Sequence, residues 1–259
     1  MTTGLFAASV GNATDARAAG PLPFSPMSFT VTVCAAVFGG ASAAFVPCLA
    51  HRLAVPRGTP PRSTCADCTA ALPTWVRAGA TCPCARPPVW TVTVGALVTG
   101  LLGATLGPAP VLLVLLPAAL LGILLAAIDL RCLRLPDPLV ALLAAATALP
   151  LSLGALLTGD PARLGRAAVA AVLSGAIYLV VALLPGAGLG LGDVKLAAVL
   201  GFTLGFLGWQ AVAAGLLAPH LINGPIVLAL LLTRRAKRRT ALPLGPALLA
   251  GALIAVLPT

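Results

Sequence analysis

The sequence predicts an all-α, polytopic membrane protein, and three observations carry this prediction. Of the 259 residues, 59% are hydrophobic and 8% are charged, whereas about 25% are charged in an ordinary soluble domain. Eight apolar segments come close to the roughly 20 residues that a helix needs to cross a bilayer. The basic residues fall between these segments, so membrane topology explains the net charge of +10 better than a nucleic-acid partner does.

The chain divides into a tail, a single helix, a loop and a helical domain. Residues 1–27 are small and polar and predict a flexible tail, and 28–50 form the first transmembrane helix. Residues 51–88 form a cytoplasmic loop with cysteines, and 89–259 hold seven further helices. We expect these helices at 89–107, 110–128, 136–157, 165–186, 194–208, 209–232 and 241–258. Proline and glycine recur inside them, which membrane helices tolerate.

The positions of Lys and Arg predict the orientation, because cytoplasmic loops retain basic residues. An outside N-terminus puts most of them in inward loops, the exceptions being Arg17, Arg163 and Arg166. The same topology places the acidic residues near 129, 137 and 193 at the cytoplasmic boundary.

All six acidic residues are aspartates, and two of them suggest chemistry. Asp129 ends one apolar segment and Asp193 opens another, where a carboxylate is costly and usually functional. Two carboxyl groups at one depth suit an aspartyl hydrolase: one takes a proton from water while the other polarises the peptide carbonyl. The structural alternative is helix capping. For Asp137, which lies between two prolines, we prefer the capping interpretation. At Asp193 capping and catalysis are compatible, whereas Asp129 ends its helix and cannot be an N-cap.

Residues around Asp193 are candidates for a supporting role. Gly190 and Gly192 allow the backbone close to whatever approaches Asp193. Lys195 either tunes the charge of Asp193 or extends to the membrane interface, and we favour the interface. A helix N-terminus favours negative charge and a C-terminus disfavours it, so we expect Asp193 to be the resting base and Asp129 the acid.

The motifs "DLRCLRLPD" at 129–137 and "GLGLGDVKLAA" at 188–198 resemble the catalytic motifs of the type IV prepilin leader peptidases, membrane aspartyl proteases of the GxGD group. The resemblance extends over most of the chain through "HRLAVPRG" at 51–58, "PRSTCADC" at 61–68 and "LPLGPALLAG" at 242–251. It implies that Asp129 and Asp193 are catalytic. It also implies a multi-pass protein of a bacterial inner or cytoplasmic membrane that removes the short basic leader of prepilins or pseudopilins at the cytoplasmic face.

Four cysteines of the inward loop form two pairs, Cys65 with Cys68 and Cys82 with Cys84. Cytoplasmic thiols stay reduced, which leaves a structural zinc site or plain thiols. We favour zinc, although the second pair is C-x-C and zinc knuckles normally use C-x-x-C.

Many members of the resembled family also methylate the new N-terminus of the pilin with S-adenosylmethionine. The family's Gly-Ser-Phe-Leu-Asn stands here as "AAFVP" at 43–47, and its usual Glu aligns with Ala96 in a chain that has no Glu. We therefore expect cleavage with little or no N-methylation.

Two other functions stay open. One is a membrane transporter, although transporters often have internal repeats and acidic residues near the bilayer midplane, and this sequence shows neither. The other is a catalytically inactive assembly protein with the same fold.

Overall fold

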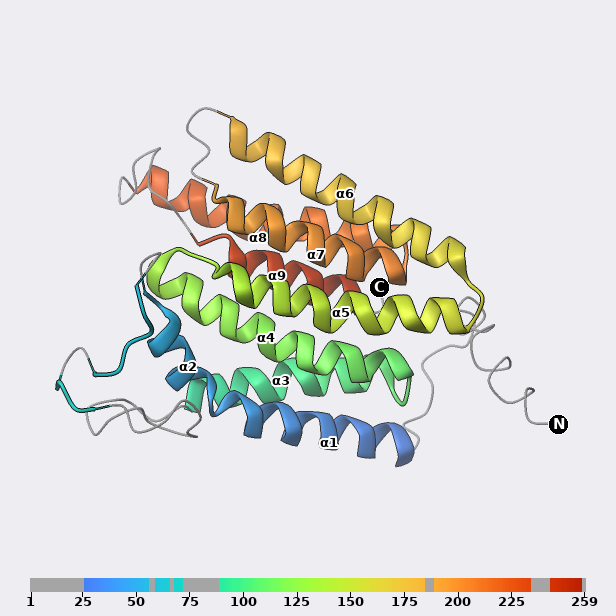
Figure 1. Ribbon diagram of the computed structural model, residues 1–259, viewed down its shortest axis with the longest axis horizontal. Helices are drawn as coiled ribbons and strands as arrows, with labels where there is room; N and C mark the ends of the chain where they lie inside the picture. Colours follow the sequence, from blue (N-terminus) through green and yellow to red (C-terminus); the bar gives the residue numbers. More distant parts are fainter. Residues whose placement is uncertain are drawn as a thin grey trace.

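The computed structural model describes residues 26–55, 59–65, 68–71, 89–184, 189–233 and 243–257. Within these residues the chain is helical, apart from one isolated bridge between Thr64 and Ala71. The helices are α1 (Pro26–Ala43), α2 (Val46–Leu53), α3 (Val89–Leu106), α4 (Pro110–Cys132), α5 (Asp137–Leu157), α6 (Pro161–Leu183), α7 (Leu191–Leu207), α8 (Trp209–Leu232) and α9 (Gly245–Val256). The long helices lie side by side in one bundle (Figure 1), which confirms the all-α prediction.

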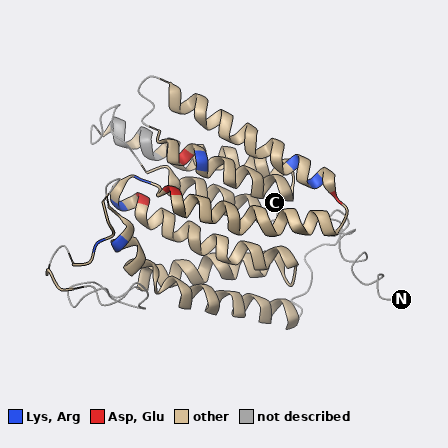
Figure 2. Ribbon diagram, viewed as in Figure 1, with Lys and Arg blue, Asp and Glu red and all other residues tan. Residues whose placement is uncertain are grey.

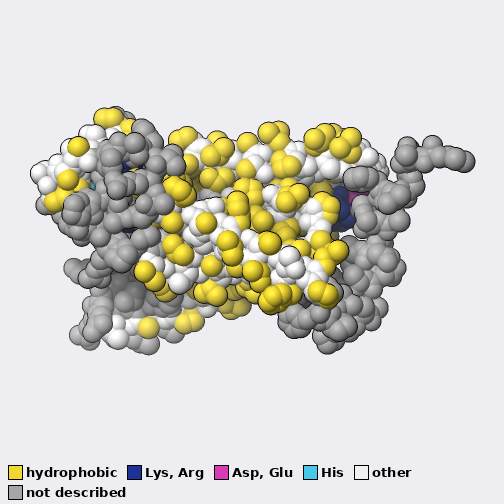
Figure 3. Space-filling view, turned by 90° about the horizontal axis from the view of Figure 1, so that it is seen from below, with side chains coloured by type: hydrophobic (Ala, Val, Ile, Leu, Met, Phe, Trp, Pro, Cys, Tyr) yellow, Lys and Arg dark blue, Asp and Glu magenta, His cyan; other side chains and the backbone are white. Residues whose placement is uncertain are grey.

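Five of the described helices, α1, α3, α4, α5 and α6, are long and apolar enough to cross a membrane. Apolar side chains cover the middle of the face in Figure 3, as expected for a surface that meets lipid. Among the other helices, α7 has 17 residues and α9 has 12. The chain is thus a polytopic membrane protein by length and composition, and the count of eight crossings stays a prediction.

The prediction of one continuous helix over 28–50 is wrong. The structure divides this segment, because α1 ends at Ala43 and α2 begins at Val46. Pro47 lies in the first turn of α2, where its missing N–H needs no partner, but it could not sit inside a continuous helix without breaking a backbone hydrogen bond. The short helix α2 then packs on α4 through Ala50 and Ile128.

The helices α6 and α7 run antiparallel in close contact. A Cβ added at Gly201 would lie 2.5 Å from Oγ of Ser174, so only a glycine allows this approach. At the far end of α7, the Arg166 guanidinium donates hydrogen bonds to the carbonyl oxygens of Gly205 (2.8 Å) and Phe206 (3.2 Å). These bonds satisfy backbone acceptors that a helix C-terminus leaves without partners.

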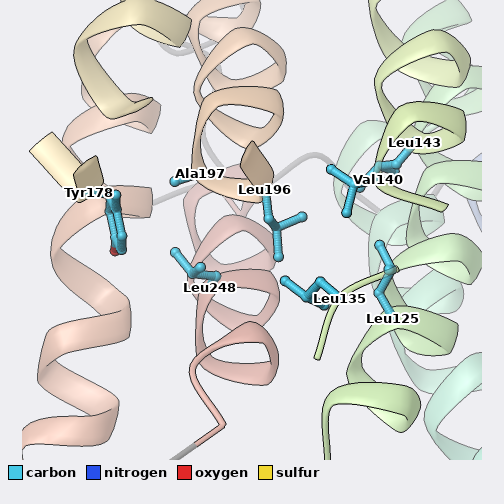
Figure 4. Packing of buried hydrophobic residues seen from close by; sticks show 8 residues of the cluster. All are labelled: Leu125, Leu135, Val140, Leu143, Tyr178, Leu196, Ala197 and Leu248. Atoms are coloured by element: carbon cyan, nitrogen blue, oxygen red, sulfur yellow. The ribbon is translucent and has the colours of Figure 1, made fainter. Parts of the chain in front are cut away.

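A buried apolar cluster joins α4, α5, α6, α7 and α9 (Figure 4). Its members are Leu125, Leu135, Val140, Leu143, Tyr178, Leu196, Ala197 and Leu248. Leu125 lies one turn before Asp129 and Leu196 lies one turn after Asp193. The cluster therefore brings the end of α4 and the start of α7 together.

The charged residues of the helices lie toward the two ends of the bundle (Figure 2). The acidic residues of α4, α5 and α7 share one end, and Asp160 lies at the opposite end with Arg163 and Arg166. The expectation that Asp129, Asp137 and Asp193 lie at one depth is confirmed. Which side of the membrane this end faces stays a prediction.

Candidate active site

Asp129 lies in the last turn of α4 and is 4% exposed. Leu133, with a left-handed φ of 51°, ends the helix and donates its N–H to the carbonyl oxygen of Asp129 at 2.8 Å. The carboxyl oxygen Oδ2 of Asp129 accepts a hydrogen bond of 3.1 Å from the backbone N–H of Gly245. This buried carboxyl group is therefore held by a residue that lies 116 positions away.

Gly245 is the first residue of α9, so its N–H is one of the donors that a helix start leaves without an intrahelical partner. A Cβ at this position would lie 2.9 Å from Oδ2 of Asp129. Only glycine thus allows the backbone to approach the carboxyl group. The sequence analysis missed this role, and the available signal was the motif "LPLGPALLAG", which contains Gly245.

Asp193 is the third residue of α7, and its side chain caps the start of that helix. Its Oδ2 accepts a hydrogen bond of 3.3 Å from the N–H of Gly190, whose carbonyl oxygen accepts one of 3.0 Å from the N–H of Asp193. The other oxygen, Oδ1, is buried and has no hydrogen-bond partner among the described residues. The capping expected for Asp193 is confirmed, and one carboxyl oxygen remains available.

The structure brings Asp129 and Asp193 together. A Cβ at Gly192 would lie 3.0 Å from Cβ of Leu135, in the segment between α4 and α5. The start of α7 therefore rests directly on the segment that follows Asp129.

Both aspartates lie at the expected helix ends, but a third helix, α9, also acts on Asp129. Asp129 does lie at the C-terminal end of its own helix, but the N-terminal N–H of α9 bonds to its carboxyl group. Each aspartate thus interacts with the positive end of a helix. The dipoles alone do not separate an acid from a base.

Asp137 and Lys195 form an ion pair that links α5 to α7. The Lys195 Nζ donates to Oδ1 of Asp137 at 2.7 Å, and the two side chains are 55% and 56% exposed. The capping interpretation of Asp137 is wrong, because Pro136 occupies the N-cap of α5 and Asp137 is the first helical residue. Lys195 does more than extend to the interface, since it connects α7, which carries Asp193, to the start of α5.

Cys65 and Cys68 lie between Thr64 and Ala71, which form an isolated antiparallel bridge. The N–H of Cys65 donates to the carbonyl oxygen of Ala70 at 2.9 Å, and Thr69 adopts a left-handed φ of 57°. Two cysteines at C-x-x-C spacing are the usual half of a four-cysteine zinc site. Cys82 and Cys84 lie outside the described residues, as do the predicted tail up to residue 25 and the basic run 234–239. Within the described part, no three His, Cys, Asp or Glu side chains gather.

Comparison with known proteins gives one match. Residues 115–234 match the type IV leader peptidase family. This segment contains Asp129, Asp137, Asp193 and Lys195. No curated protein and no solved structure matches the chain.

Proposed function

We propose that this chain, whose residues 115–234 match the type IV leader peptidase family, is a membrane aspartyl endopeptidase that removes the short basic leader of type IV prepilin-like or pseudopilin proteins. The observation that carries this proposal is that Asp129 and Asp193, from helices distant in sequence, lie at one end of the bundle, where the start of α7 rests on the segment that follows Asp129. Nearby carboxyl groups that share one proton provide an acid and a base at the same pH.

In the proposed mechanism Asp193 is the base. Its Oδ1 accepts no hydrogen bond from the described residues, so this oxygen has lone pairs for a water proton. Water attacks the scissile carbonyl carbon, Asp193 takes the water proton, and Asp129 gives its proton to the carbonyl oxygen. The C–N bond then breaks, the amine leaves with the proton from Asp193, and Asp129 recovers a proton from the diol. The pair returns to its starting state, and one water is consumed.

An apolar cavity of about 250 Å³ supports a substrate with an apolar segment. It lies between α3, α4, α5, α7 and α9, and its lining includes Ala126 and Pro246. Ala126 lies one turn before Asp129, and Pro246 follows Gly245, so the cavity begins beside the aspartates. In this proposal it holds apolar side chains next to the scissile bond, while the rest of the substrate helix stays in lipid.

The remaining parts of the proposal concern topology and a second activity. The leader approaches from the cytoplasmic face, in line with the distribution of Lys and Arg. Zinc at the cysteine pairs stabilises the loop before α3. Transfer of a methyl group from S-adenosylmethionine is weak or absent, because the chain has no Glu to replace the one in the family motif.

The test uses purified protein in detergent and a prepilin-like protein with a basic leader and an apolar segment. The expected result is one clipped product from the wild type and none from Asp129→Asn or Asp193→Asn. Mass spectrometry of the product, with S-adenosylmethionine present, should give an unmethylated N-terminus. A wild type that yields no product would favour the transporter or the inactive assembly protein.

A further inference from the structure

Tyr178 in α6 is the one tyrosine of the chain, and it is 1% exposed. Its ring packs beside Ala197 and Leu248 (Figure 4), and its centroid lies 5.8 Å from that of His220. Its hydroxyl is buried and forms no hydrogen bond with the described residues. Buried tyrosine hydroxyls normally have a partner, and a phenylalanine would fill the same space without this need.

The packing of α6 on α7 brings Tyr178 to the start of α7. A Cβ at Gly175 would lie 3.2 Å from Cβ of Ala198. The helices run antiparallel, so Tyr178, one turn beyond Gly175, lies beside the first turns of α7. This position is close to Asp193, the third residue of α7.

Two buried polar atoms without a partner among the described residues thus belong to neighbouring side chains: the Tyr178 hydroxyl and Oδ1 of Asp193. A phenol both donates and accepts hydrogen bonds, whereas a carboxylate only accepts them. A water molecule bound between the two groups would satisfy both, because it would donate to Oδ1 and form a second bond with the phenol.

We propose that Tyr178 is a positioning residue of the active site: its hydroxyl orients the attacking water so that one O–H of that water points at Oδ1 of Asp193. This inference rests on the proposed function. Orientation of the nucleophile acts on the chemical step, so the hydroxyl contributes to kcat and little to substrate binding.

Ser174 provides a matched control. It lies on α6 one turn before Tyr178, is fully buried, and also has a hydroxyl without a partner among the described residues. Its hydroxyl faces Gly201, two turns beyond Asp193 along α7. Ser174→Ala therefore removes the same kind of group from the same helix without reaching the aspartates.

The experiment compares Tyr178→Phe, Ser174→Ala, Asp193→Asn and the wild type in detergent, with the prepilin-like substrate, by kcat, KM and Tm. Neither hydroxyl bonds to any residue of the described part of the chain, so neither variant should lower Tm. We expect Tyr178→Phe to reduce kcat about 10-fold or more with KM within about 2-fold, and Ser174→Ala to keep both constants.

Three results would overturn the role of Tyr178. They are a Tyr178→Phe enzyme with kcat within about 2-fold of the wild type, a fall in Tm that accompanies the loss of activity, and an equal loss in Ser174→Ala. A wild-type protein as inactive as Asp193→Asn would instead contradict the proposed function itself.

Discussion

Replacing Gly245 with alanine tests how the backbone of α9 holds Asp129. The added Cβ would lie 2.9 Å from Oδ2, 3.3 Å from Cγ and 3.5 Å from Cβ of Asp129. The carboxyl group is buried, so it must move away from the N–H that now bonds to it at 3.1 Å. A hydrogen bond to a charged group contributes about 1.5–3 kcal/mol. If the reaction needs this geometry, kcat should fall about 10- to 150-fold.

Gly154→Ala is the control for this substitution. Gly154 lies inside α5 and has nothing within 4 Å of its Cβ position. Alanine there should leave kcat unchanged and keep or raise Tm, because alanine favours helix more than glycine does. Both variants are assayed by the rate of leader removal in detergent. A Gly245→Ala enzyme that cleaves as fast as Gly154→Ala would refute the reasoning.

Two further predictions concern contacts that hold α7. Reversing one charge of the pair, as Asp137→Lys or Lys195→Asp, should reduce the rate of cleavage, and the double reversal should recover most of that rate. Each change should alter the free energy of unfolding by about 1 kcal/mol or less, because the pair is exposed. No recovery in the double reversal would show that the pair does not link α5 to α7 in this way. Arg166→Met removes two hydrogen bonds to the C-terminal carbonyl oxygens of α7 and should lower Tm by several degrees. Arg163→Met is the control, because it leaves these two hydrogen bonds in place. An unchanged Tm in Arg166→Met would contradict the proposed anchoring.

Much of the fold follows from the lengths of the apolar segments. The predicted helix over 209–232 has the bounds of α8, and the predicted end at 107 lies one residue past Leu106 of α3. The break before Pro47 was readable from the proline, but the apolar segment around it was long enough for one crossing. The prediction of one helix over 28–50 therefore followed the length of the apolar segment and did not take account of Pro47.

The site was predictable only in part. Asp129 and Asp193 stood out because the chain has few acids and both lie at segment ends. The bond from Gly245 to Asp129 joins helices distant in sequence, and a dipole argument based on each residue's own helix could not include α9. The partnership of Asp137 with Lys195 likewise depends on how α5 meets α7 in space.

The most direct test of the central claim is the rate of leader removal by Asp129→Asn, Asp193→Asn and the double variant, measured on one prepilin-like substrate. If the two carboxyl groups act as one unit, each single variant loses turnover as completely as the double. Wild-type turnover in either single variant would contradict the account.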